Sequence, residues 1–78
     1  MHISIRSLQG QNLTLEVQPT DTIQTVKMKI QDMNDMRTDR QRLMFDQTSL
    51  ENGRTLTSYG IGPNVVLQLM EREYLTTI

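Results

Sequence analysis

Two short runs of alternating residues near the start of the chain most strongly constrain its fold. Alternation with a period of two is typical of a strand with one buried face. The inward positions of the two runs are all aliphatic: Ile3, Ile5, Leu13, Leu15 and Val17. Gly10 lies between the runs and supplies the backbone freedom that a hairpin turn needs. The first 17 residues therefore predict a β-hairpin with one apolar face.

A single amphipathic helix is expected after the hairpin. Its apolar stripe has spacings of three and four residues and consists of Ile23, Val26, Ile30 and, as an extension, Met33. Asp21 or Thr22 can accept hydrogen bonds from the free N–H groups of the first turn. Asn34 and Asp35 tolerate the left-handed backbone conformation better than most residues, so the helix is predicted to end there.

Two further strands are predicted at residues 41–45 and 65–70. Their inward residues are Leu43, Phe45, Leu67 and Leu69. The tight turn Asp46-Gln47 and a looser segment with a few apolar anchors lie between these strands. The whole chain of 78 residues is short enough for one domain. The order of elements predicts an α+β fold, with one helix packed across a sheet of four to five strands.

Composition argues against several classes of function. The chain has no cysteine, and His2 is its only histidine, so we expect no metal site, no other cofactor and no disulfide. We also expect no enzyme, because no nucleophile and base can be matched. The net charge of −1 and the pI of about 5.7 give no nucleic-acid footprint. No apolar run is long enough to span a membrane, so we expect no membrane association.

The sequence resembles ubiquitin without a gap from Met1 to Arg72. The segments that carry the resemblance include Thr14-Leu15-Glu16-Val17, Asp21-Thr22-Ile23, Lys29-Ile30-Gln31-Asp32, Gln41-Arg42-Leu43 and Gly53-Arg54-Thr55-Leu56. The resemblance implies a β-grasp fold with a mixed sheet. It also implies a domain at residues 1–72, followed at 73–78 by a flexible tail or by a boundary to a longer chain.

The resemblance implies a binding surface as well. The positions that match the apolar docking patch of ubiquitin are Leu8, Met44, Gln68 and Met70. Strand alternation independently places the last three on the outward face of the sheet. Methionine adapts to irregular partners, so a patch that contains Met44 and Met70 remains suited to binding. In ubiquitin-like proteins the equivalents of Arg42 and Arg72 help to engage acidic segments, and Arg suits carboxylate pairing.

The residues at the end of the sequence depart from the family. Ubiquitin is attached to other proteins through a terminal Gly-Gly, and residues 70–78 contain no such dipeptide. Tyr74 and Leu75 are bulky where a thin, flexible end is needed. Ubiquitin chains grow on lysines, and only Lys27 and Lys29 are retained as acceptors. Lys27 is expected to be the less accessible of the two. A covalent modifier is therefore disfavoured.

The expected function is that of a non-conjugated, monomeric interaction module. Through its apolar patch it would dock on ubiquitin-binding domains or on receptors associated with the proteasome or a segregase, in the cytoplasm, the nucleus or both. An alternative is a divergent or redesigned ubiquitin variant with an altered surface. In that case Tyr74, Leu75 and Ile78 could pack on a neighbouring sheet edge and lead to self-association.

Overall fold

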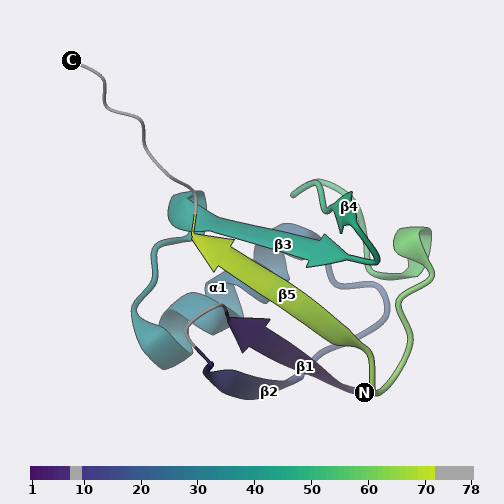
Figure 1. Ribbon diagram of the computed structural model, residues 1–78. Helices are drawn as coiled ribbons and strands as arrows, with labels where there is room; N and C mark the ends of the chain where they lie inside the picture. Colours follow the sequence, from purple (N-terminus) through teal and green to yellow (C-terminus); the bar gives the residue numbers. More distant parts are fainter. Residues whose placement is uncertain (8–9, 72–78) are drawn as a thin grey trace.

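A computed structural model describes residues 1–7 and 10–71, which form one sheet with a helix across one face (Figure 1). The strands are β1 (His2–Ser7), β2 (Asn12–Glu16), β3 (Gln41–Phe45), β4 (Thr48–Ser49) and β5 (Val66–Glu71). The helices are α1 (Ile23–Asn34) and the short 3-10 turns η1 (Thr38–Arg40) and η2 (Thr57–Tyr59). The strand order is β2-β1-β5-β3-β4. This is the α+β, β-grasp arrangement that the sequence predicted.

The amino-terminal hairpin forms as expected. β1 and β2 pair antiparallel, with Ile3 opposite Leu15 and Ile5 opposite Leu13. Gly10 has a φ of 86°, a left-handed conformation that glycine adopts without steric cost. The end of the hairpin is closed by a hydrogen bond of 2.8 Å from the Val17 N–H to the Met1 carbonyl oxygen.

Helix α1 begins and ends at the residues that its capping chemistry favours. Thr22, and not Asp21, is the N-cap, and its Oγ1 accepts from the Thr25 N–H at 3.2 Å. Asp21 instead accepts from the Gln18 N–H just before the helix. Asp35 ends the helix in the left-handed conformation with a φ of 61°. The expected extension of the apolar stripe was wrong, because Met33 is 53% exposed.

Strand β5 lies at the centre of the sheet, between β1 and β3. It runs parallel to β1 and antiparallel to β3. Both of its backbone edges are therefore paired, while its side chains from Val66 to Met70 alternate between the helix side and the opposite side of the sheet. The described residues contain a fifth strand, β4, which sequence reasoning had left within the looser segment.

The core lies between the sheet and α1. Its buried residues are Ile3, Ile5, Leu15, Val17, Ile23, Val26, Ile30, Leu43, Leu50, Leu56, Ile61, Leu67 and Leu69. Every strand position predicted to face inward belongs to this set or, like Leu13 and Phe45, packs half-buried against it. Apolar burial of this kind is the main source of stability in a domain of this size.

Candidate binding face on the open side of the sheet

The side of the sheet opposite α1 is not covered by any described element (Figure 1). In each strand, the side chains that alternate with the core residues point to this open face. Arg6, Arg42, Val66 and Gln68 are exposed there, and Met44 and Met70 are half-buried. The open face is therefore the surface on which the predicted patch must be sought.

The register between β3 and β5 brings four of the predicted site residues together. Met44 on β3 pairs with Gln68 on β5, and Arg42 pairs with Met70. Directly opposed side chains on one face lie about 5 Å apart at Cβ, which is contact distance. These four residues, Arg42, Met44, Gln68 and Met70, are called the central patch below. The other two predicted binding residues, Leu8 and Arg72, lie outside the described residues.

Each of the two strands beside β5 carries an arginine on the open face. Arg6 on β1 pairs with Gln68, on the side opposite Met44. Arg42 lies on β3, and its Nε donates to Ser49 Oγ at 3.4 Å, a long hydrogen bond. Both guanidinium groups are on exposed side chains and remain available to a carboxylate. Arrayed in this way, the face can bind an apolar surface that carries acidic groups at its margin.

One apolar residue on the open face was not among the predicted site residues. Val66, at the start of β5, is 49% exposed and lies two positions from Gln68 on the same face. It alternates with the inward residues Leu67 and Leu69 and so points outward, but the resemblance gave it no role. Alternation tells which side of the sheet a side chain faces, but it does not tell how much of that side chain is exposed. The exposure of Val66 therefore could not be predicted from the sequence.

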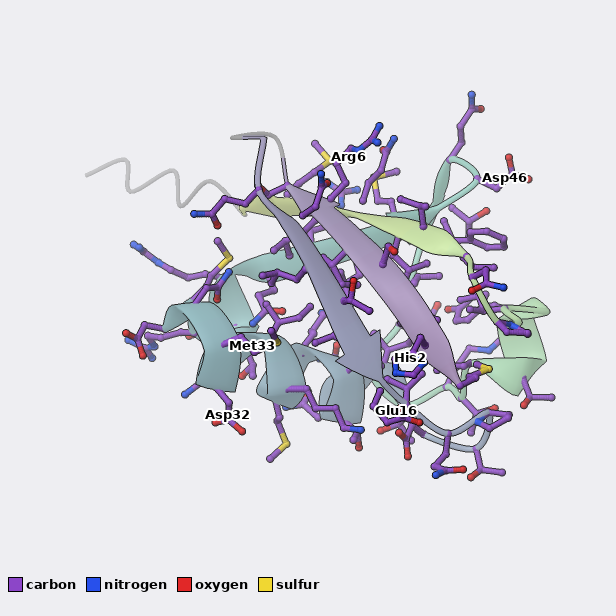
Figure 2. All side chains as sticks on the ribbon, turned by 90° about the horizontal axis from the view of Figure 1, so that it is seen from below. His2, Arg6, Glu16, Asp32, Met33 and Asp46 are labelled. Atoms are coloured by element: carbon purple, nitrogen blue, oxygen red, sulfur yellow. The ribbon has the colours of Figure 1, made fainter. Side chains whose placement is uncertain are left out.

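A group of charges occupies the far corner of the same face. His2 Nε2 lies 2.8 Å from Glu16 Oε1 (Figure 2). The Met1 amino group lies 3.3 Å from Glu16 Oε2. The hydrogen bond from the amino group, followed by the nearby His2 charge, lowers the pKa of the Glu16 carboxyl below its usual range. His2 is thus exposed, as expected, but has a carboxylate partner that was not foreseen. Figure 2 shows Arg6 at the opposite end of β1.

The two lysines lie on α1, which packs against the face of the sheet opposite to the open face. Lys27 is 6% exposed, and its Nζ donates to Asn52 Oδ1 at 2.7 Å. Lys29 is more exposed, and its Nζ donates to the Glu16 carbonyl oxygen at 2.6 Å. Lys27 is therefore the less accessible lysine, in agreement with the expectation.

A groove next to β4 differs in character from the open face. It encloses about 480 Å³ and is bordered by Lys27, Gln41, Arg42, Glu51 and Asn52 among others. This lining is mainly polar or charged, whereas pockets for small organic ligands are mostly apolar. Within the described ranges, no group of three or more His, Cys, Asp or Glu side chains is arranged to hold a metal ion. None of the described helices combines the length and apolar character needed to cross a membrane.

Comparison with known proteins agrees with this architecture. The model of the ubiquitin family matches residues 3–74. Ubiquitin-like protein 4A of Homo sapiens is 31% identical over 70 residues, which cover 90% of this chain. The proteins of that name from Callithrix jacchus and Mus musculus show the same identity and coverage. The chain spans about 45% of the length of these relatives. Domains of this kind are protein-interaction modules and not enzymes, and on the match over residues 3–74 the chain belongs to the ubiquitin family.

Proposed function

We propose that this domain is a non-conjugated interaction module that docks through the central patch. Its partners are ubiquitin-binding domains or receptors associated with the proteasome or a segregase, in the cytoplasm, the nucleus or both. The observation that carries this proposal is the register that places Met44 beside Gln68 and Met70 beside Arg42 on one open face. Apolar residues collected on an exposed face are typical of a protein-binding surface.

The surface chemistry supports a protein partner. Met44 and Met70 have long, flexible side chains that fit irregular apolar surfaces. Arg42 can pair with a carboxylate at the margin, and Gln68 can both donate and accept hydrogen bonds. The patch is small, so a dissociation constant of about micromolar size is expected.

The non-conjugated part of the proposal rests on the residues present at 70–78, where the bulky Tyr74 and Leu75 differ from the thin Gly-Gly segment of the family. The test is incubation of the protein with ATP and the enzymes that activate ubiquitin. No adduct is expected. A covalent adduct through the carboxyl end would show that the domain is a modifier.

Docking is tested by amide-shift titration of the isotopically labelled domain with a panel of ubiquitin-binding and proteasome receptor domains. Shifts should cluster at Met44, Gln68, Met70 and Arg42, and Met44→Glu should abolish them. Met28→Glu is the matched control, because Met28 is 54% exposed and lies on α1. Unchanged binding by Met44→Glu would refute docking through this patch. Sedimentation of the free domain at two concentrations tests whether it is a monomer, as expected from the sequence.

A further inference from the structure

Asn52 is the only asparagine in the sequence that is followed by glycine. The backbone nitrogen of the next residue can attack an asparagine side chain at Cγ, and a Cβ on that next residue hinders the approach. Asn52 and Gly53 are both exposed, and they lie in a turn closed by a hydrogen bond of 3.2 Å from the Arg54 N–H to the Glu51 carbonyl oxygen. Asn52 also borders the groove next to β4, so water reaches its side chain.

The backbone nitrogen of Gly53 is available for such a reaction. Among residues 1–7 and 10–71, no acceptor is bound to the Gly53 N–H. A Cβ built on Gly53 would meet no heavy atom within 4 Å, so the space beside this residue is open. A bond from the Gly53 nitrogen to Asn52 Cγ can therefore form without the loss of a hydrogen bond from that nitrogen.

The side-chain carbonyl group of Asn52 is held by a buried lysine. The Nζ of Lys27 donates to Asn52 Oδ1 at 2.7 Å. Attack at Cγ converts Oδ1 from a carbonyl oxygen into an oxyanion, so negative charge develops on the atom that Lys27 already contacts. A donor in place at such an oxygen stabilises the transition state. Lys27 is thus positioned to accelerate the attack on Asn52.

We propose that Asn52 is a modification site at which the folded domain converts asparagine to aspartate. In the first step the Gly53 nitrogen loses its proton to solvent and bonds to Asn52 Cγ. The bond from Cγ to the side-chain nitrogen breaks, and that nitrogen takes a proton and leaves as ammonia, so a cyclic imide remains. In the second step water adds to one imide carbonyl, its bond to the Gly53 nitrogen breaks, and that nitrogen regains a proton. One water is consumed and one ammonia is released, with no oxidation or reduction.

The fold selects between the two products that water can form. Addition at Cγ gives aspartate with the main chain unchanged, whereas addition at the backbone carbonyl carbon gives isoaspartate, which lengthens the main chain by one carbon. Lys27 activates Cγ, because it donates to the oxygen on that carbon. The Asn52 carbonyl oxygen accepts from the Gln24 N–H of α1 at 3.1 Å, a hydrogen bond that aspartate keeps and isoaspartate displaces. Aspartate also places a carboxylate against Lys27, and such a charge-assisted hydrogen bond is stronger than the original one.

Timed incubation of the folded chain in neutral buffer tests the inference. Ion-exchange chromatography separates the product, which has gained a negative charge, and peptide mapping distinguishes aspartate from isoaspartate. A synthetic peptide of residues 50–55 with blocked ends has the same local sequence and lacks Lys27. Gly53→Ala is the matched control, because its Cβ meets no other atom but hinders the attack. Lys27→Met keeps most of the apolar side chain and removes the ammonium group.

The folded chain should yield mainly aspartate and the peptide mainly isoaspartate, because Lys27 and α1 act only in the fold. Gly53→Ala should not be converted. Lys27→Met should be converted about tenfold more slowly, a smaller loss than at an enclosed oxyanion site because water also reaches this oxygen. Isoaspartate as the main product of the folded chain, or no conversion in the time that exhausts the peptide, would overturn the inference. Both of these results come from the unaltered chain, so they decide the question even if Lys27→Met does not fold.

Discussion

Gln41 at the start of β3 donates from its Nε2 to the carbonyl oxygen of Lys27 in α1, at 2.9 Å. The same Nε2 also donates to the Met36 carbonyl oxygen at 2.9 Å, so one side chain joins the sheet, the helix and the segment after it. Gln41 is fully buried. Its Oε1 has no hydrogen-bond partner among the described residues, a cost that the two donated bonds offset.

Replacing Gln41 should strongly destabilise the domain. Gln41→Ala removes both hydrogen bonds and leaves a cavity, so the free energy of unfolding should fall by about 2–4 kcal/mol. Gln41→Met keeps most of the volume and removes the unpartnered oxygen, so its loss should be about 1–2 kcal/mol. Urea denaturation of the three proteins measures both differences. An equal loss for the two variants would mean that the Gln41 side chain stabilises the domain through its hydrogen bonds alone and that its packing makes no contribution.

A pH-dependent contribution is expected from Glu16. The Met1 amino group, which donates a hydrogen bond to the carboxylate, and the nearby His2 charge hold the pKa of Glu16 below its usual range. A carboxyl whose pKa is lower in the folded state stabilises the fold above its unfolded pKa of about 4.3. That contribution is lost as the pH falls through the folded pKa. Glu16→Gln should therefore be less stable than the unaltered domain near neutral pH and equally stable in acid.

Unfolding measured as a function of pH checks this difference. His2→Gln serves as a second variant, because it removes one of the two main causes and should give an intermediate effect. The group is exposed, so added salt should reduce the difference between Glu16→Gln and the unaltered domain. A difference that persists in strong acid would show that Glu16 acts through packing and not through charge.

The sequence predicted the core residues better than the surface residues. Alternation and helical spacing placed Ile3, Leu15 and Ile30 in the core, because a buried face imposes a period that one sequence displays. The same reasoning cannot distinguish an apolar residue that is covered from one that is not. For this reason Met33 was expected to extend the buried stripe and Val66 was left without a role.

The candidate site could be predicted only in part, because local patterns give the direction of a side chain and not its neighbours on other strands. Alternation gave the outward direction of Met44 and Gln68, and the family resemblance joined them into one patch. Their pairing across β3 and β5 depends on the strand order, which local patterns do not encode. The contact between His2 and Glu16 depends on the hairpin register, and single-residue inspection of the only histidine could not reveal it.

The two lysines should differ in reactivity towards an amine acylating reagent. Lys29 is 38% exposed, whereas Lys27 is 6% exposed and donates to Asn52. In the folded domain Lys29 should be acylated several times faster than Lys27, and in denaturant the two rates should converge. Asn52→Ala removes one acceptor of the Lys27 ammonium group and should accelerate acylation of Lys27 without affecting Lys29. Mass spectrometry of timed samples measures both rates, and equal rates in the folded domain would contradict the burial of Lys27.

The turn between β3 and β4 offers a stabilising substitution. Asp46 and Gln47 both have positive φ values, 53° and 67°, in a two-residue hairpin loop. Positive φ at both positions is typical of the type I′ turn, for which Asn-Gly is the preferred pair. Gln47→Gly removes the steric cost of a left-handed side-chain-bearing residue, so it should raise the free energy of unfolding by about 0.5–1 kcal/mol. Adding Asp46→Asn should preserve or increase this gain.

Gly60, at another site, allows a control substitution in the reverse direction, from glycine to a residue with a side chain. Its φ is 73°, and a Cβ built there would meet no heavy atom within 4 Å. Gly60→Ala therefore tests backbone conformation without a steric clash, and it should destabilise the domain by about 1 kcal/mol. Thermal and urea unfolding of the two single variants should show changes of opposite sign. A loss of stability in both variants would contradict the prediction. Favourable contacts of the Gln47 side chain would then outweigh the steric cost of its left-handed conformation.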